Sequence, residues 1–93
     1  MDKILIIDND SATRKILKQT FVSSGFAVAM ACDGATAMAT FNAEMPRLVI
    51  LEPRIPGLAG QDFCREIRHR SLSVPILVLS AAKSEVDKVL LLD

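Results

Sequence analysis

Acidic and polar side chains follow three separate apolar runs of this sequence. Asp8, Asn9 and Asp10 come directly after the first run, Glu52 follows another, and Ser80 follows the last of the three. Oxygen ligands of this kind suit Mg²⁺, which usually keeps several waters and binds a phosphate as well. Carboxylates that meet repel one another, and a divalent cation relieves that repulsion. The sequence therefore predicts a magnesium and phosphoryl site, provided that the three runs end at one place.

The apolar runs have the length and composition of buried strands. Continuous runs rich in β-branched residues are typical of parallel strands that are covered on both faces. We expect four strands, at residues 4–7, 26–31, 48–51 and 76–79. Amphipathic segments with capping residues lie between and after them. We expect these segments to be helices, at residues 11–24, 33–44, 60–69 and 84–93.

This alternation of strands and helices predicts an α/β domain with a parallel sheet. Strands that are joined by single helices run parallel with right-handed crossovers, so their carboxyl ends lie at one edge. Ligands of such sheets bind at that edge. We therefore expect Asp8, Glu52 and Ser80 to be neighbours.

Composition limits the classes of function. The chain has 93 residues, 51% of them hydrophobic, and its 11 basic and 11 acidic side chains cancel. This size predicts a single domain over residues 1–93, and zero net charge argues against nucleic acid as a partner. No apolar run is long enough to cross a membrane. None has the form of a signal peptide either, so we expect a cytoplasmic chain. The two cysteines, Cys32 and Cys64, lack the spacing of a zinc site or redox motif, so we expect reduced, partly buried thiols.

Three stretches of the sequence resemble the receiver domain of bacterial two-component response regulators. They are ILIIDND at residues 4–10, LVILEPRIPGLAG at residues 48–60 and PILVLSAAK at residues 75–83. The resemblance covers the whole chain. It implies a CheY-like, flavodoxin-like fold, that is, a three-layer doubly wound sheet with strand order 2-1-3-4. It also implies a signalling module of a phosphorelay that is not an enzyme, with a sensor histidine kinase or a downstream signalling protein as its partner.

The resemblance assigns roles to single positions. Asp8 matches the first of two acids that hold Mg²⁺, and Glu52 stands at the phosphoacceptor position. Ser80, followed by Ala81, matches the hydroxyl that binds the phosphate. Pro56 and Gly57 match the turn after the acceptor, where Gly57 suits a positive φ.

Three departures from the family pattern weaken the expected chemistry. Asn9 replaces the second acid, so we expect the set Asp8, Asn9, Asp10 and Glu52 to hold Mg²⁺ only weakly. Glu52 replaces an Asp, and its extra methylene displaces the carboxylate by roughly one C–C bond, which in-line transfer tolerates poorly. The sequence also ends at Asp93, before a fifth strand, its Lys and a fifth helix. We therefore expect a C-terminally truncated pseudo-receiver in which Glu52 imitates part of the phosphorylated state.

Other interpretations of the same residues stay open. Asp10 precedes a helix and suits its N-cap better than a metal ligand. Glu52 could be a solvated loop acid, and Ser80 a turn cap. An ordinary Mg²⁺-dependent, phosphorylatable receiver is the first alternative function. The second is a fragment of a haloacid-dehalogenase-type phosphatase, because Asp8-Asn9-Asp10 also resembles the DxD loop of that class.

The end of the sequence predicts an association surface. Without a fifth strand, the fourth strand would be an exposed apolar edge, which favours pairing with another chain. The last segment is also apolar on more than one face. We therefore expect a homodimer that forms through this strand edge and the last segment.

Overall fold

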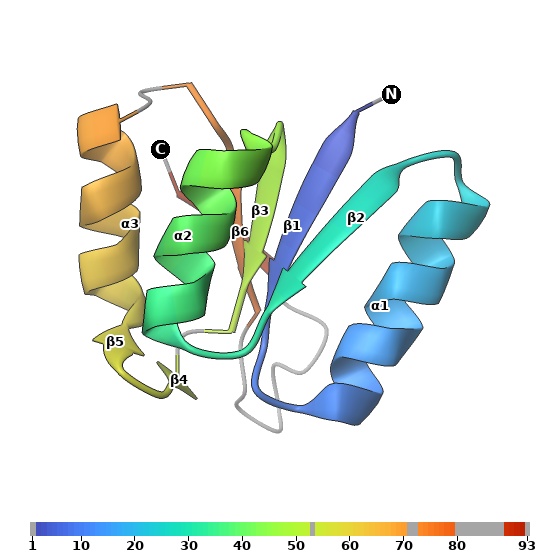
Figure 1. Ribbon diagram of the computed structural model, residues 1–93, viewed down its shortest axis with the longest axis horizontal. Coiled ribbons are helices and arrows are strands. Elements are labelled where there is room, and N and C mark those ends of the chain that lie inside the picture. The colour runs from blue at the N-terminus through green and yellow to red at the C-terminus, as the bar shows by residue number, and fades with distance from the viewer. Residues whose placement is uncertain (1, 53, 71–72, 80–88, 93) are drawn as a thin grey trace.

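The computed structural model describes residues 2–52, 54–70, 73–79 and 89–92. Their backbone forms three helices and seven strands, two of which are two-residue strands of a small hairpin (Figure 1). In chain order, the elements are β1 Lys3–Ile7, α1 Ser11–Ser23, β2 Ala27–Ala31, α2 Gly34–Glu44, β3 Leu48–Leu51, β4 Arg54–Ile55, β5 Leu58–Ala59, α3 Gly60–Arg70, β6 Ile76–Leu79 and β7 Val89–Leu92.

The main sheet has the strand order β2-β1-β3-β6-β7. Its first four strands pair in parallel, and β6 is the fourth of them in the chain. The order 2-1-3-4 that the family resemblance implied is therefore confirmed. In the register, Ile7 lies beside both Ala31 and Leu51, and Leu51 lies beside Val78. The carboxyl ends of these four strands thus form one edge, at the bottom of Figure 1.

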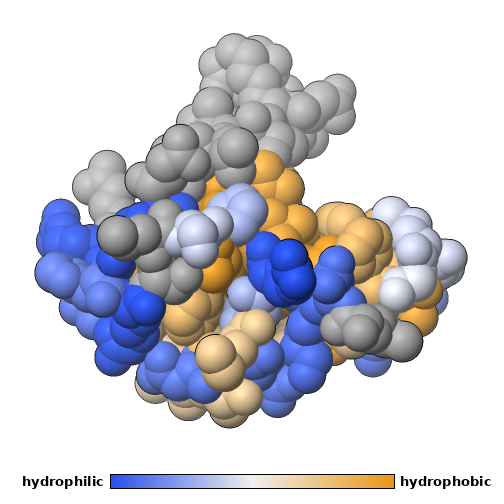
Figure 2. Space-filling model, turned by 90° about the horizontal axis from the view of Figure 1, so that it is seen from above, coloured by the Kyte–Doolittle hydropathy of each residue, from blue (hydrophilic) through white to orange (hydrophobic). Residues whose placement is uncertain are grey.

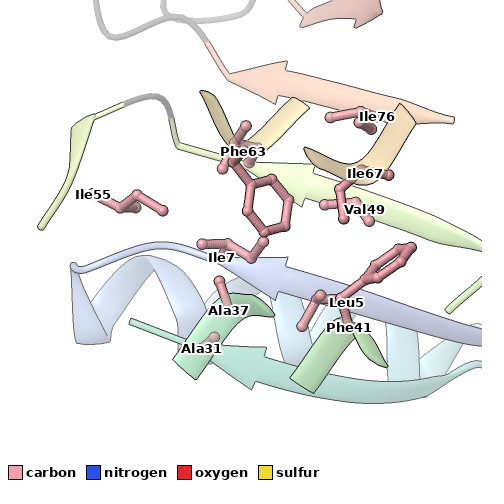
Figure 3. Packing of buried hydrophobic residues seen from close by; sticks show 11 residues of the cluster. Leu5, Ile7, Ala31, Ala37, Phe41, Val49, Ile55, Phe63, Ile67 and Ile76 are labelled. Atoms are coloured by element: carbon pink, nitrogen blue, oxygen red, sulfur yellow. The ribbon is translucent and has the colours of Figure 1, made fainter. Parts of the chain in front are cut away.

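Helices cover both faces of the sheet. On one face, α2 and α3 pack against the sheet through Phe41, Phe63 and Ile67, which meet strand residues such as Leu5 and Val49 (Figure 3). On the other face, Leu17 and Phe21 of α1 pack against a smaller buried cluster of strand residues. The continuous apolar runs are explained by this arrangement, because successive strand residues point to opposite faces and both faces are buried.

The helix boundaries follow local capping. Asp10 and Asp33 are the N-caps of α1 and α2, and their carboxylates accept hydrogen bonds from the amides of Thr13 and Thr36. These bonds satisfy amides that have no partner inside the helix. After α1, Gly25 takes a positive φ of 94°, which favours glycine. The helices predicted at residues 11–24, 33–44 and 60–69 agree with the structure to within a residue at each end.

The predicted helix over residues 84–93 is wrong where the structure describes it. Val89–Leu92 forms β7, which pairs antiparallel with β6 and places Leu79 opposite Val89. Residues 84–88 of this predicted helix lie outside the described residues. Periodicity alone does not distinguish a strand from a helix in so short an apolar run. Because β7 pairs with the outer side of β6, the prediction that β6 is an exposed edge is also wrong.

The surface mixes hydrophobic and hydrophilic residues. Figure 2 views the molecule from above, the side at which the parallel strands begin, and shows hydrophobic residues in the middle and at the right, with hydrophilic residues at the left and along the lower part. Both cysteines are free. Cys64 is half-buried as expected, whereas Cys32 is exposed, so the prediction of a partly buried thiol is wrong there. In the part of the chain that is described, no helix has the length and apolar character that a membrane span requires.

Candidate functional site

Asp8 and Glu52 lie side by side at the carboxyl edge of the sheet. They directly follow Ile7 and Leu51, which are neighbours in the parallel register of β1 and β3. The amide of Glu52 donates a hydrogen bond of 2.8 Å to the carbonyl of Ile7, and the amide of Asp8 donates one of 3.1 Å to the carbonyl of Ala31. Main-chain bonds to neighbouring strands therefore hold both acids in place. The structure brings these two acids together as the topology argument expects.

The carboxyl group of Asp8 is the buried acid of the site. Asp8 is only 5% exposed, and its Oδ1 accepts a 2.9 Å hydrogen bond from the amide of Asp10. Burial raises the pKa of Asp8, and the bond from the Asp10 amide partly offsets this. The negative charges of Glu52 and Asp10 raise the pKa further, whereas the positive charge of Arg14 lowers it. Asp8 thus lies in a field of like charges, which a bound cation would relieve.

Arg14 reaches this edge from the first turns of α1. Its Nη1 donates a 2.6 Å hydrogen bond to the main-chain carbonyl of Asp8. Its own amide donates to the carbonyl of Asp10 at 3.0 Å. Sequence reasoning assigned Arg14 no role at the site. Its position six residues after Asp8, on the first turns of the following helix, belongs to the pattern that resembles receivers, and this was the signal that the sequence offered.

The side chain of Asp10 caps the N-terminus of α1. Its Oδ2 accepts hydrogen bonds from the amide of Thr13, at 3.3 Å, and from the Thr13 hydroxyl. These bonds lower the pKa of Asp10, with the hydroxyl bond as the largest cause. Asp10 and its neighbour Asn9 are both exposed. The capping role that the sequence favoured for Asp10 is therefore the one that the structure gives it.

The donor set of the site fits a sparsely held cation. Among the described residues, no three or more Asp, Glu, His or Cys side chains form a cluster that could hold a metal ion. A closed cage of protein ligands is therefore absent from this part of the chain. Two neighbouring carboxylates remain, those of Asp8 and Glu52, and this is the number that Mg²⁺ commonly takes from protein when water and phosphate supply its other ligands.

A tight loop follows Glu52 and is tied to the next layer. Arg54–Ile55 and Leu58–Ala59 pair as the antiparallel hairpin β4–β5, and Gly57 takes a φ of 83° within it. This agrees with the turn that the sequence predicts. The amide of Gly34, at the start of α2, donates a 2.8 Å hydrogen bond to the carbonyl of Pro56. The loop beyond the acceptor position is thereby fixed to the helix layer.

Two predicted site residues cannot be placed. Ser80 and Ala81 lie outside the described residues, so their predicted contact with a phosphoryl group stays a prediction. The nearest described position is Leu79, the last residue of β6. Because β6 is parallel to β3 and in register with it, this end of β6 lies at the edge that carries Asp8 and Glu52.

A separate cavity lies at the opposite edge of the sheet. It has a volume of about 290 Å³ and is lined by residues at the ends of α2 and α3 and before β3 and β6: Phe41, Asn42, Met45, Pro46, Arg70 and Val74. The Nε of Arg70 donates a 3.1 Å hydrogen bond to Oδ1 of Asn42 across this region. The cavity shares no residue with the acidic site, so it plays no part in the chemistry of that site.

Comparison with known sequences identifies one family. The profile of the response regulator receiver domain matches residues 4–93. The alkaline phosphatase synthesis transcriptional regulatory protein PhoP of Bacillus subtilis is 36% identical over 88 residues, which are 95% of this chain and 37% of PhoP. The probable transcriptional regulator ycf27 of Guillardia theta is 40% identical over 88 residues, or 95% of this chain and 34% of ycf27. The chain thus spans little more than a third of the length of these relatives.

Solved structures of receivers share the fold. TrrA of Thermotoga maritima in complex with Mg²⁺-BeF has a TM-score of 0.82 at 28% identity, covering 95% of this chain and 76% of TrrA. TrrA in complex with the histidine kinase ThkA has a TM-score of 0.79 at 31% identity, covering 87% of this chain and 70% of that one. The chemotaxis response regulator CheY4 of Vibrio cholerae has a TM-score of 0.83 at 27% identity, covering 95% of this chain and 75% of CheY4.

Proposed function

The chain belongs to the response regulator receiver domain family, and from this premise we propose that it is a pseudo-receiver, which signals by binding and conformation instead of by turnover. The observation that carries the proposal is the position of Glu52. It follows β3 directly, beside the buried Asp8, where receivers carry the phosphoacceptor Asp. The family match over residues 4–93 also favours this function over that of a phosphatase fragment.

Glutamate at this position favours mimicry over transfer. Its carboxylate reaches farther from the strand than that of Asp, so it carries negative charge toward the place that a phosphoryl group would occupy. The same displacement misaligns the carboxylate for in-line attack, to which a shift of about 1 Å is costly. We infer that Glu52 holds the edge of the sheet in part of its phosphorylated arrangement.

The proposal includes a magnesium ion held by few protein ligands. Asp8 and Glu52 would contribute carboxylate oxygens, and the amide oxygen of Asn9 would be a further neutral ligand. The ion would supply positive charge between the two acids and toward a phosphoryl group. The Mg²⁺-BeF complex of TrrA supports metal binding in a related receiver. With Asn9 in place of a second acid, we expect the site to hold Mg²⁺ only weakly.

Membership of the receiver family indicates which proteins this domain would bind. A structure of TrrA with the histidine kinase ThkA supports a sensor kinase as the upstream partner, and a downstream signalling protein is the other. Zero net charge argues against nucleic acid binding through this domain. We further propose that the protein works in the cytoplasm, with reduced thiols. We also propose a homodimer, which light scattering at high concentration would detect. Because β7 covers the outer side of β6, the two copies would meet along the outer edge of β7 and not along β6.

The test compares the protein with a restored phosphoacceptor. Glu52→Asp is examined by NMR of backbone amides, free and with Mg²⁺ and beryllofluoride, the phosphoryl analogue bound to TrrA. If Glu52 imitates the phosphoryl group, amide shifts of the untreated wild type lie between those of free and beryllofluoride-bound Glu52→Asp. Glu52→Gln is the matched control, because it keeps the length of the side chain and removes its charge. It should resemble free Glu52→Asp.

Two results would overturn the mimicry. In the first, the wild type coincides with both Glu52→Gln and free Glu52→Asp, so that the carboxylate of Glu52 changes nothing. In the second, Glu52→Asp does not respond to beryllofluoride, so that the edge is not a receiver site. A phosphorylatable receiver is the remaining alternative, and it is distinguished by covalent modification of Glu52 itself.

A further inference from the structure

The edge of the sheet that carries Asp8 and Glu52, called the acidic edge below, also carries a positive charge in a fixed place. This charge belongs to Arg14, which has no role in the proposed function. Arg14 is half-buried, and the charges that act on the carboxyl group of Asp8 come from Glu52, Asp10 and Arg14. Arg14 also acts on Asp10. A cation that approaches Asp8 therefore meets attraction from the acids and repulsion from the guanidinium group. An Arg keeps its charge at any ordinary pH, so this repulsion is permanent.

The hydrogen bond from Arg14 fixes where its charge lies. Nη1 is 2.6 Å from the carbonyl oxygen of Asp8, so the guanidinium group is held at the loop that carries the acid. A surface Lys or Arg normally moves among many positions and is screened by solvent. Held beside a buried carboxylate, a charge is screened much less.

Geometry at Asp8 does not depend on Arg14 alone. The amide of Asp8 is bonded to the carbonyl of Ala31, and the carboxylate of Asp8 accepts from the amide of Asp10. The loop is also fixed by the capping bonds of Asp10 to Thr13. Removing the Arg14 side chain therefore removes a charge from the site while at least three other hydrogen bonds keep the loop in place.

We propose that Arg14 limits the affinity of the edge formed by Asp8 and Glu52 for divalent cations, because it holds a positive charge against the loop after β1. The proposal rests on the magnesium site of the proposed function. It adds that the affinity is low for two reasons, the neutral Asn9 and the built-in cation. Arg14 thus offsets part of the repulsion among the acids when no metal is bound.

The experiment titrates Mg²⁺ into the wild type and into variants of Arg14. The chain has no Trp and no Tyr, so binding is followed by the amide NMR signals of Asp8 and Asp10. Arg14→Met should bind Mg²⁺ roughly three- to tenfold more tightly than the wild type, as expected for one unit charge near a divalent ion in a partly solvated site. The gain should shrink as KCl is raised.

Further variants separate charge from structure. Arg14→Gln keeps a donor without the charge and should behave like Arg14→Met. Arg14→Lys keeps the charge and should restore the affinity of the wild type. Lys15→Met removes a charge from an exposed neighbour on the same helix and should leave the affinity unchanged. A merely structural role of Arg14 predicts the reverse, with weaker binding in Arg14→Met and in Arg14→Lys.

The Mg²⁺ affinities of the wild type and of Arg14→Met decide whether the charge of Arg14 weakens binding. Tighter binding by Arg14→Met, or binding by Arg14→Met alone, supports it. If the wild type binds Mg²⁺ and Arg14→Met binds equally or less tightly, the inference is wrong and the proposed magnesium site stands. If neither protein binds, the inference and the proposed site are both wrong.

Discussion

Burial, a hydrogen bond and neighbouring charges all act on the carboxyl group of Asp8. Asp8 is buried, it lies beside Glu52, and its carboxylate accepts a hydrogen bond from the amide of Asp10. Its pKa is raised above the ordinary value of 3.8, with burial as the largest cause. The folded state therefore holds the proton of Asp8 more tightly than the unfolded state does. The contribution of Asp8 to the free energy of unfolding consequently falls as pH rises from about 3.8 through the folded-state pKa of Asp8.

Asp8→Asn should therefore stabilise the metal-free protein at neutral pH. Asn keeps an oxygen that can accept from the Asp10 amide, and its amide group can donate to Glu52. We expect a gain of about 1 kcal/mol in the free energy of unfolding at pH 7, the size of many single-residue effects. The gain should vanish below about pH 3.8, where Asp8 is protonated in both states. Urea unfolding at a series of pH values, without divalent ions, measures it. A less stable variant at pH 7 would contradict the account.

The sequence predicted where the residues of the site lie better than it predicted which side-chain contacts they make. The place of Asp8 and Glu52 follows from strand ends, which a sequence indicates through apolar runs and the polar residues after them. The capping role of Asp10 follows from its place before a helix. The bond from Arg14 to the Asp8 carbonyl does not follow in the same way, because it depends on how α1 leans over the end of β1.

A few local sequence features determine where the helices and turns begin and end. Asp10 and Asp33 start helices, and Gly25 and Gly57 permit the turns at which the chain reverses or tightens. These features are readable from sequence because their causes lie within four residues. The strand β7 is different, since an antiparallel partner at β6 decides its conformation and the sequence gives no sign of that partner. This is why the helix expected over residues 84–93 was wrong at Val89–Leu92.

Gly57→Ala tests whether the turn after Glu52 needs its glycine. The φ of 83° is strained for any residue with a Cβ. The added Cβ itself would lie 3.7 Å from the amide nitrogen of Gly34, which is an ordinary contact. We therefore expect a backbone cost of about 1–2 kcal/mol in the free energy of unfolding. Gly25→Ala, at a φ of 94° and with open space around its Cβ, should cost as much while leaving amide shifts near Asp8 unchanged.

An unchanged stability of Gly57→Ala would contradict this prediction. If Gly57→Ala unfolds at the same denaturant concentration as the wild type, then the loop after β3 does not hold the positive φ. The bond from the Gly34 amide to the Pro56 carbonyl would then not fix this loop as described.

At the scale of the whole molecule, the two hydrophobic layers hold the acidic edge together. The larger layer joins α2 and α3 to the sheet and contains Phe63, which is fully buried (Figure 3). The continuous apolar runs in the sequence predicted both layers, because a strand that is covered on both faces is apolar at successive positions. They did not predict which side chains meet, since packing depends on the angle of each helix across the sheet.

Phe63→Ala should destabilise the protein severely. Removing a fully buried Phe side chain typically costs about 3–5 kcal/mol, which is a large part of the 5–15 kcal/mol that stabilises a small domain. Ile16→Ala is the matched control, because Ile16 is 62% exposed on α1 and should change the stability by less than about 0.5 kcal/mol. Chemical unfolding measures both. Similar losses in the two variants would mean that the larger layer does not form as described.

The proposal that Glu52 imitates a phosphorylated residue is tested by the intact mass of the protein after incubation with a small acyl phosphate and Mg²⁺. We expect no added phosphate on the wild type, because the proposed role of Glu52 is to stand in for the phosphorylated residue and not to accept the group. A gain of one phosphate by the wild type that Glu52→Gln does not show would contradict the proposal, and would make the protein an ordinary phosphorylatable receiver.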